Sequence, residues 1–259
     1  MTHPNRPGFA GSPAHARLGM PRHILLLAAL FTAFSLAGLT SSQSASPPAA
    51  TVNPPAGFVP LFPQDGIPAG WMVRSWNDVS LPAPPSASWK VTSGTLQGGA
   101  PRGTWLVSAR EYGDFILDFE FRLGESGQGG VGLRFPMAGD PAFEGLEVQM
   151  VDPRFYGTNY TGQPWELTGA LFKAVAPTVD AYKPMEWNHY TIECRGSSVS
   201  VTLNGKKVID VDLTRVTDAP PRGKPLAQRP RRGRIGFQEV SRGTGRVEIR
   251  NARIQVLAG

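Results

Sequence analysis

The sequence offers little cysteine or histidine chemistry. Cys194 is the single cysteine among 259 residues, so an intrachain disulfide and a cysteine-ligated metal cluster are both excluded. Three of the four histidines, His3, His15 and His23, precede residue 24, which leaves His189 alone in the rest of the chain. A multi-histidine metal centre is therefore not expected there, and a Ser-His-Asp triad could use only His189.

Helical periodicity and charge are also scarce. Charged residues make up 18% of the chain, whereas it holds 30 glycines and 25 prolines. This composition favours many short strands joined by turns, and the length allows one large all-β domain or two small ones. Cys194 falls on the same face as Ile192 in an alternating stretch, which predicts a buried structural thiol.

The net charge of +6 is unevenly distributed. Residues 215–259 hold 11 basic and 3 acidic side chains, whereas residues 46–214 hold 12 basic and 17 acidic ones. The basic segment 222–234 lacks interleaved aromatics and is rich in proline. We therefore expect solvated surface there rather than a nucleic-acid site, with binding of acidic envelope polymers as the alternative.

The N-terminal residues have the pattern of an export signal. Residues 24–39 form an apolar run of 16, which Arg17, Arg22 and His23 precede and small polar residues follow. This pattern predicts a signal peptide over 1–45, then a Pro/Ala linker over 46–56 and one domain over 57–259. The protein is then exported, periplasmic or extracellular, without a membrane span in the mature chain, or it stays tethered to the envelope by an uncleaved signal segment.

The stretch 144–152, which reads EGLEVQMVD, alternates strictly between apolar and polar residues. A period of two predicts a β-strand with one face in a core and one face presented. Glu147 and Gln149 lie on the presented face, where a carboxylate and a carboxamide could hold a polyhydroxylated ligand. The alternative for Glu147 is a solvated strand residue.

The stretch 129–135 carries glycines on its presented face. Its alternation puts Val131, Leu133 and Phe135 in the core, and Gly130, Gly132 and Arg134 on the open face. Glycines at such positions leave room for a ligand to approach the sheet.

Short alternating segments and turn signals continue along the chain. An Asn204-Gly205 turn predicts a hairpin over 199–213. The count comes to about a dozen strands with no convincing helix, which favours an all-β jelly-roll β-sandwich of two antiparallel sheets. Other predicted strands are 58–62, 70–74, 115–122, 168–172, 187–195, 234–238 and 246–256.

Several segments in a fixed order resemble the 3-keto-disaccharide hydrolase domain family over about residues 57–257. They are LEVQMVD at 146–152, TGALF at 168–172, EWNHYTI at 186–192, LNGKKVID at 203–210, GRIGFQ at 233–238 and VEIRNARI at 247–254. The resemblance implies a concanavalin A-like fold and exported bacterial proteins of carbohydrate breakdown. It also implies cleavage of disaccharides oxidised to a ketone at C3 of one sugar.

The chain departs from the family pattern at two places. It has Gln128-Gly129-Gly130 where members commonly read NSG, and Phe237-Gln238-Glu239-Val240-Ser241 where many read LQDHG. Gln238 is kept, whereas the late histidine is absent.

The resemblance implies that Arg134, Glu147, Gln149 and Gln238 converge on a concave sheet. We expect Glu147 to act as a general acid or base, because a ketone at C3 acidifies the hydrogen at C2. Arg134 or Lys173 would stabilise the enolate oxygen. In the alternative chemistry of an ordinary glycosidase, Asp152, Glu144 or Glu239 would be the second carboxyl beside Glu147. Gln149 and Gln238 would hold hydroxyl groups.

Further candidates line the loops and strand ends. The loop aromatics, Trp105, Tyr156, Tyr160 and Trp165, could stack on sugar faces or simply pack the loops. Asp152 is a further candidate for binding the substrate. His189 is either a site member or a surface residue.

No cofactor and no metal are predicted. A structural Ca²⁺ held by Asp140, Asp152 and loop carbonyls is left open, although no D-x-D-x-D-G loop is present.

Three functions remain after the sequence is considered. The first is an exported hydrolase or lyase of 3-keto-glycosides. The second is a non-catalytic, lectin-like carbohydrate-binding module, which the missing late histidine favours. The third is a structural envelope module. The expected partner is an oligosaccharide or a 3-keto-glycoside, with no nucleic acid.

Overall fold

A computed structural model describes residues 57–99, 101–157, 162–217 and 222–258, all within one compact unit, Pro48–Gly259. The predicted signal peptide and linker lie outside the described residues, as does Tyr160. The strands are β1 Val59–Pro60, β2 Trp71–Ser75, β3 Trp89–Thr92, β4 Thr95–Gly98, β5 Thr104–Tyr112, β6 Phe115–Leu123, β7 Gln128–Phe135, β8 Leu146–Val151, β9 Asn188–Arg195, β10 Ser198–Leu203, β11 Lys206–Asp212, β12 Gly233–Glu239 and β13 Val247–Val256. The helices are short: α1 Pro141–Glu144 and the 3₁₀ turns η1 Pro153–Tyr156, η2 Pro164–Glu166 and η3 Leu226–Gln228.

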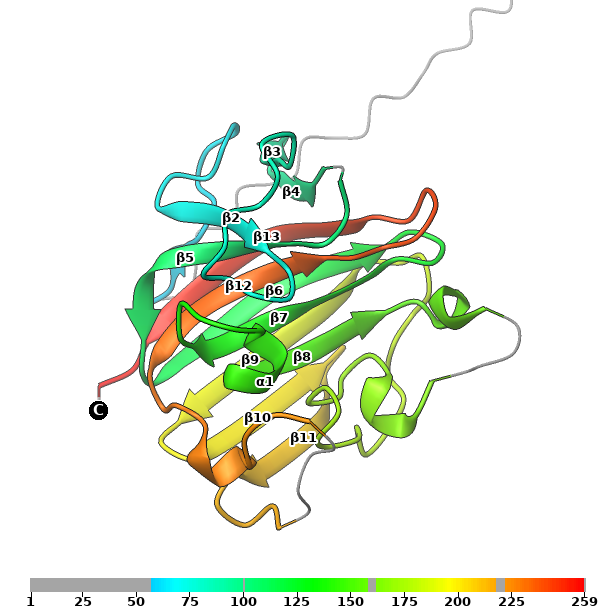
Figure 1. Ribbon diagram of the computed structural model, residues 1–259. Helices are drawn as coiled ribbons and strands as arrows, with labels where there is room; N and C mark the ends of the chain where they lie inside the picture. The colour runs from blue at the N-terminus through cyan, green and yellow to red at the C-terminus, as the bar shows by residue number, and fades with distance from the viewer. Residues whose placement is uncertain (1–56, 100, 158–161, 218–221, 259) are drawn as a thin grey trace, which may run out of the picture. The chain divides into compact units, whose positions relative to one another are not determined.

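Two antiparallel sheets face each other (Figure 1). One has eight strands in the order β11-β10-β9-β6-β13-β4-β3, with β1 paired to β13. The other has five strands in the order β2-β5-β12-β7-β8. The predicted all-β jelly-roll sandwich of two antiparallel sheets is therefore confirmed. Among the described residues, no helix is long and apolar enough to span a membrane.

The core lies between the sheets, where the alternating strands place their apolar faces. In β6, Phe115, Leu117, Phe119 and Phe121 are all fully buried. Phe119 meets Phe237 of β12 edge to face, with ring centroids 5.3 Å apart, and so joins the two sheets. Burial of each such side chain contributes about 2–3 kcal/mol relative to exposure. Cys194 is buried here as a free thiol, as predicted.

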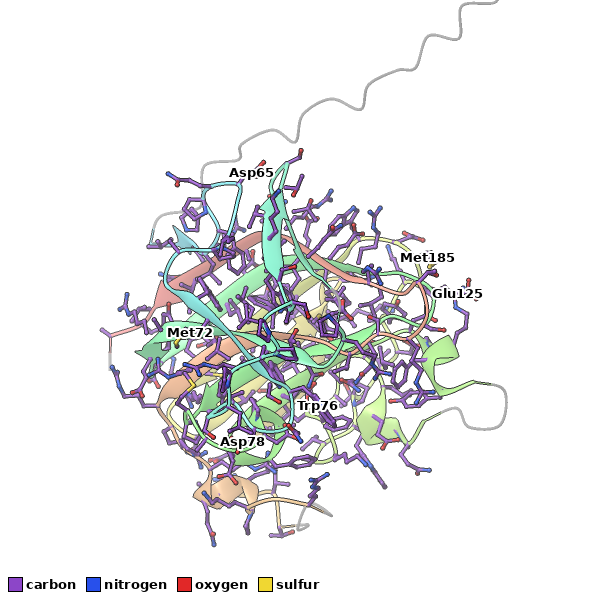
Figure 2. All side chains as sticks on the ribbon, turned by 45° about the horizontal axis from the view of Figure 1, so that its top comes forward. Asp65, Met72, Trp76, Asp78, Glu125 and Met185 are labelled. Atoms are coloured by element: carbon purple, nitrogen blue, oxygen red, sulfur yellow. The ribbon has the colours of Figure 1, made fainter. Side chains whose placement is uncertain are left out.

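The outer face of the five-stranded sheet is partly covered by loops. The segment 76–83 follows β2 and carries Trp76 and Asp78, both labelled in Figure 2. The Asp78 carboxylate accepts a hydrogen bond from the Gly139 amide at 2.9 Å, and the Val79 amide donates to the Gly139 carbonyl at 2.9 Å. These bonds tie the segment to the loop that leads into α1, so the loops leave only part of the sheet face open.

The segment 166–175 covers the free edge of β8. The Gln149 amide donates to the Ala170 carbonyl at 3.0 Å, and the Phe172 amide donates to the Glu147 carbonyl at 2.8 Å. The predicted strand 168–172 is nevertheless wrong, because only isolated bridges through Leu171 form. Covering the edge in this way satisfies its backbone groups without extending the sheet.

Candidate functional site

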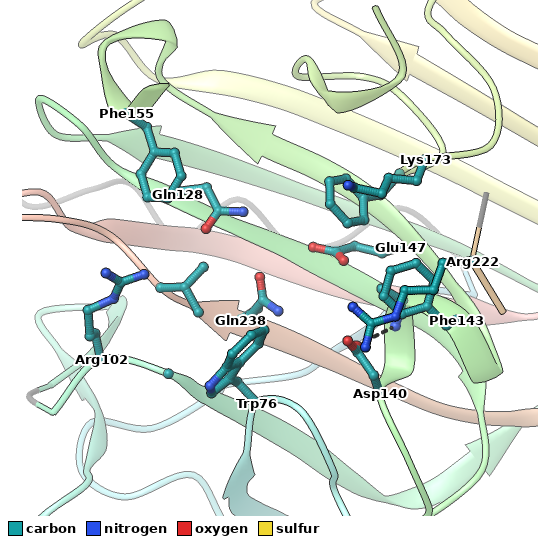
Figure 3. A pocket seen from close by; sticks show the side chains of 14 residues that line it. Trp76, Arg102, Gln128, Asp140, Phe143, Glu147, Phe155, Lys173, Arg222 and Gln238 are labelled. Carbon is teal, nitrogen blue, oxygen red and sulfur yellow. Dashed lines mark hydrogen bonds between the residues drawn. The ribbon is translucent and has the colours of Figure 1, made fainter. Parts of the chain in front are cut away.

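A pocket of about 530 Å³ opens on the outer face of the five-stranded sheet (Figure 3). Three neighbouring strands provide its floor, with Glu147 from β8, Gln128 from β7 and Gln238 from β12. The walls come from loops and α1: Trp76, Arg102, Gly103, Asp140, Ala142, Phe143, Phe155, Phe172, Lys173, Arg222 and Val240. Polar groups on strands and aromatic groups on loops are the composition expected of a ligand site.

Glu147 lies at the centre of the pocket floor (Figure 3). Its side chain is 3% exposed, and it occupies the space above Gly130 on the adjacent strand, where a Cβ would collide with the carboxyl group. None of the described residues donates a hydrogen bond to this carboxyl. Burial therefore raises the pKa of Glu147 well above its ordinary value, and the nearby charge of Asp140 raises it further. Burial therefore favours the protonated form of Glu147, a carboxylic acid that can donate a proton.

Asp140 is the second carboxyl of the pocket. It caps α1, and its Oδ1 accepts a hydrogen bond from the Ala142 amide at 3.1 Å. Burial raises the pKa of Asp140 to about 6, although the Ala142 amide and the Arg222 charge both oppose the rise. Asp140 is therefore mostly ionised at pH 7, whereas the fuller burial of Glu147 favours its protonated form. Two carboxyls in such different environments suit a base and an acid.

Gln238 directs an unsatisfied amide into the pocket. Its side chain is 5% exposed, and its Oε1 finds no hydrogen-bond partner among the described residues. An unpaired buried polar atom costs free energy that a ligand hydroxyl could recover. Beside it, the Val240 amide donates to the Gln128 carbonyl at 2.9 Å, which fixes Val240 in the wall. Val240 stands at the position of the late histidine in the family pattern.

Three cations reach the pocket from separate loops. The Lys173 Nζ lies 3.1 Å from the Glu166 Oε1, whereas the Arg222 guanidinium stacks over the Phe143 ring at 4.7 Å from its centroid. Arg102 lies on the loop before β5, at the end of the pocket away from Asp140 and Arg222 (Figure 3).

The basic segment 222–234 is more than the solvated surface predicted for it. The Arg229 side chain is 3% exposed and donates to the Ala142 and Gly145 carbonyls at 2.9 and 2.7 Å. These hydrogen bonds hold the segment against α1, and Arg222 of the same segment lines the pocket.

Arg134 is not in the pocket, so the prediction that it lies on the open face beside Glu147 is wrong. Its guanidinium is fully buried and donates to the carbonyls of Gly113 and Gly196 at 2.7 and 2.6 Å and to the Asp114 carboxylate at 2.9 Å. Gly113 and Asp114 lie in the turn that leads from β5 to β6 of the other sheet, and Gly196 lies in the turn between β9 and β10 of that other sheet. Arg134 therefore ties the ends of the two sheets together.

A local reversal of the backbone explains the wrong assignment. Arg134 has a φ of +54°, and the pairing of β12 with β7 shifts register beside it. An irregularity of this kind breaks the two-residue alternation. As a result, Phe135 turns to the outer face and lies over Gly132, 6.0 Å from the Trp105 ring, instead of entering the main core.

The other predicted carboxyls are committed elsewhere. Glu239 follows Gln238 and so points into the sandwich, where its two oxygens accept from the Ser241 and Val247 amides at 2.8 Å each. Asp152 is fully buried and forms two hydrogen bonds of 2.7 Å with the Arg154 guanidinium. Neither carboxyl lines the pocket.

His189 belongs to the opposite side of the molecule. It lies in β9 of the eight-stranded sheet, and its Nε2 is 2.9 Å from the Asp118 Oδ2. The hydrogen bond to Asp118 raises the pKa of His189. The structure therefore supports its role as a surface residue.

Two binding candidates flank the pocket without lining it. Gln149 shares the face of Glu147, but it is fully buried under the segment 162–175, with its Nε2 3.3 Å from the Glu166 carbonyl. Trp165 is 38% exposed in η2, outside the pocket lining. The predicted set thus contributes Glu147, Gln238 and Lys173 to one site.

The sequence reasoning missed most of the pocket walls. Asp140 was considered only for Ca²⁺, although Asp140-Pro141 is a signal for a helix start. Gln128 shares the parity of Gly130 on the same strand, so alternation alone would have found it. Trp76, Arg102 and Arg222 lie on loops without periodicity, and no local pattern points to them.

No group of three or more potential metal-ligating side chains gathers within the described part of the chain. Asp140 and Asp152, the residues considered for Ca²⁺, bind protein groups at separate places.

Solved structures share the fold. A protein of Parabacteroides distasonis ATCC 8503, provisionally assigned as a glycosyl hydrolase, is 27% identical, with a TM-score of 0.63 over 77% of this chain and 99% of its own. A second protein of that organism with the same assignment is 21% identical, with a TM-score of 0.63 over 78% and 95% of the two chains. No curated protein matches the chain. The family profile named 3-keto-alpha-glucoside-1,2-lyase-like domain matches residues 57–255, which confirms the resemblance found in the sequence, and the chain belongs to this family.

Proposed function

We propose that this protein is carbohydrate-active and that its pocket cleaves the glycosidic bond of a sugar oxidised to a ketone at C3. The observation that carries the proposal is the pairing of Glu147 and Asp140 in one pocket. Burial raises the pKa of both groups, but it leaves Asp140 near 6 and Glu147 well above its ordinary value. Asp140, mostly ionised at pH 7, suits the base, and Glu147, whose burial favours the protonated form, suits the acid.

The chemistry balances with these two groups. The Asp140 carboxylate takes the proton from C2, and the electron pair passes into the enolate of the C3 ketone. The ketone then re-forms as the C1–C2 double bond forms and the C1–oxygen bond breaks. Glu147 gives its proton to the departing oxygen. Water then adds across the C1–C2 double bond. Glu147 takes a proton from the water whose hydroxyl bonds to C1, and Asp140 returns its proton to C2, so both groups regain their starting states.

Other pocket residues suit the charge that develops in this reaction. Lys173 is the cation that faces the floor beside Glu147 in Figure 3, and it would stabilise the enolate oxygen. The unsatisfied Gln238 Oε1 would accept a hydrogen bond from a sugar hydroxyl. The sequence had left open whether Arg134 or Lys173 stabilises the enolate oxygen, and we assign this role to Lys173.

The comparisons support this proposal at a coarse level. The family name describes lyase-like domains that act on 3-keto-alpha-glucosides, and the 27% identical relative is assigned provisionally as a glycosyl hydrolase. Export to the periplasm or the extracellular space remains part of the proposal, on the strength of the apolar run at 24–39.

A second candidate is a carbohydrate-binding module without catalysis. The observation that favours it is Val240, which lines the pocket at the position of the family's late histidine. An apolar side chain there provides shape but no proton transfer.

Incubation with 3-keto-trehalose or 3-keto-lactose, followed by analysis for released sugar, separates the two candidates. We expect release by the wild type and a loss of at least about 100-fold in kcat for Glu147→Gln, because one acid–base group contributes about that much. His189→Gln, a change on the opposite sheet, is the matched control and should keep full activity. Binding without release would favour the module, and full activity of Glu147→Gln would remove Glu147 from the mechanism.

A further inference from the structure

Trp76 presents a fixed aromatic surface at one wall of the pocket. Its side chain is 46% exposed, yet its backbone is anchored, because its amide donates to the Gly103 carbonyl at 3.2 Å and its carbonyl accepts from the Trp105 Nε1 at 2.9 Å. The indole lies against Gly103, where a Cβ would come within 2.8 Å of the Trp76 Cδ1. An exposed indole held in this way is suited to stacking on the face of a sugar ring.

Arg102 adjoins this surface through Gly103 and carries a charge without a local counterpart. No carboxylate among the described residues forms an ion pair with Arg102, and its guanidinium lines the same pocket as Trp76. It lies at the opposite end of the pocket from Asp140 (Figure 3). Trp76 lies between Arg102 and Asp140 in this view, so the corner formed by Trp76 and Arg102 borders the two carboxyls only on its Trp76 side (Figure 3).

The pocket lining as a whole has more cationic than anionic side chains, which adds to the positive charge of Arg102. Its lining holds three cations, Arg102, Lys173 and Arg222, against two carboxyls, Asp140 and Glu147. Burial raises the pKa of Glu147 and so disfavours its charged form, and Lys173 is already paired with Glu166. A cleft with an excess of one charge concentrates ligands of the opposite charge.

We propose that the Trp76–Arg102 corner is a subsite for an acidic sugar ring, which stacks on the indole and pairs its anionic substituent with the Arg102 guanidinium. A uronic acid fits this chemistry, because its carboxylate projects from the ring edge and a guanidinium binds carboxylate through two parallel hydrogen bonds. A sulfated sugar offers the same charge at a comparable place. The subsite rests on the proposed carbohydrate function and narrows the ligand class to acidic glycosides.

The test is a binding measurement with unoxidised disaccharides, so it does not depend on catalysis. Isothermal titration calorimetry on the full chain compares cellobiose, its uronic acid form with one glucuronate ring, and a cellobiose sulfated at C6. We expect the uronate to bind about tenfold more tightly than cellobiose at low salt, which corresponds to about 1.4 kcal/mol. High salt should reduce this preference, because the pair is exposed to solvent.

Variants separate the two parts of the subsite. Arg102→Gln should abolish the preference for the acid and leave the Kd of cellobiose within about twofold, whereas Trp76→Ala should weaken both sugars about tenfold. Arg195→Gln is the matched control, since Arg195 is an exposed arginine in β9 of the other sheet that pairs with Glu193.

Each outcome of this test has a defined meaning. Tighter binding of the uronate alone assigns a carboxylate, whereas equal gains for the uronate and the sulfated sugar assign any anion. Equal affinity for the acid and neutral forms, a preference that survives in Arg102→Gln, or no binding at millimolar concentration would overturn the subsite. Failure of the proposed cleavage appears instead as a lack of sugar release from neutral 3-keto-glycosides, so the two failures are distinguishable.

Discussion

Replacing Glu147 by glutamine tests the protonation state on which the mechanism depends. Free glutamic acid titrates near a pKa of about 4.3, whereas burial raises the pKa of Glu147 in the folded protein. Between these two values the folded protein holds one proton that the unfolded chain has lost. The contribution of this proton to the free energy of unfolding is therefore complete below the ordinary carboxyl pKa. It is lost as pH rises toward the raised pKa, by about 1.4 kcal/mol for each pH unit.

The glutamine side chain of the Glu147→Gln variant has no such dependence, because an amide stays neutral and nearly keeps the shape of a protonated carboxyl. As pH rises above the ordinary carboxyl pKa, the free energy of unfolding of Glu147→Gln should therefore rise relative to the wild type, by about 1.4 kcal/mol for each pH unit until the raised pKa of Glu147 is reached. Urea denaturation followed by circular dichroism at several pH values measures this difference. Glu186→Gln, at an exposed glutamate, serves as the control and should follow the wild type. Parallel pH curves for the wild type and Glu147→Gln would show that Glu147 is ionised in the fold, and the reasoning would fail.

Three further predictions concern the residues around Glu147. Asp140→Asn should lower kcat at least about 100-fold and remove the acidic limb near pH 6 from the pH–rate profile, because Asp140 must be ionised to act as the base; a profile with the limb intact would assign it to another group. Gly130→Ala should displace the Glu147 carboxyl, because the added Cβ would collide with it. We expect a cost of about 1–3 kcal/mol in thermal unfolding and a clear loss of kcat. Unchanged kinetics would contradict the close approach of the Glu147 carboxyl to Gly130. Arg134→Met should cost about 3 kcal/mol of stability, because Asp114 and the Gly113 and Gly196 carbonyls lose their guanidinium donor, while KM and kcat of the folded fraction stay unchanged. A selective loss of activity would return Arg134 to the site.

Much of the fold could be predicted because strand alternation is a local property. Burial of Phe115, Leu117 and Phe119 on one face of β6 follows from the two-residue period, and the Asn204-Gly205 hairpin follows from its turn chemistry. The same reasoning placed Glu147 and Gln238 on presented faces. It failed for 168–172, because an apolar segment that covers a strand edge has the same composition as a strand.

The candidate site was only partly predictable, since it depends on which strands become neighbours. His189 and Glu147 both lie on presented faces, yet β9 and β8 belong to different sheets, so the two side chains face opposite sides of the sandwich. Periodicity assigns a side chain to one of two faces of its own strand, and it contains no information about strand order.

The sequence by itself determined an all-β chain, the family to which residues 57–255 belong, and the presented positions of Glu147 and Gln238. Only the tertiary structure decided that Asp140 is the second carboxyl and that Arg134 joins the two sheets. The physical reason is that a pKa, a pocket and an ion pair arise from groups distant in the chain. Asp140 acquires its pKa of about 6 from burial beneath loops that local patterns do not place.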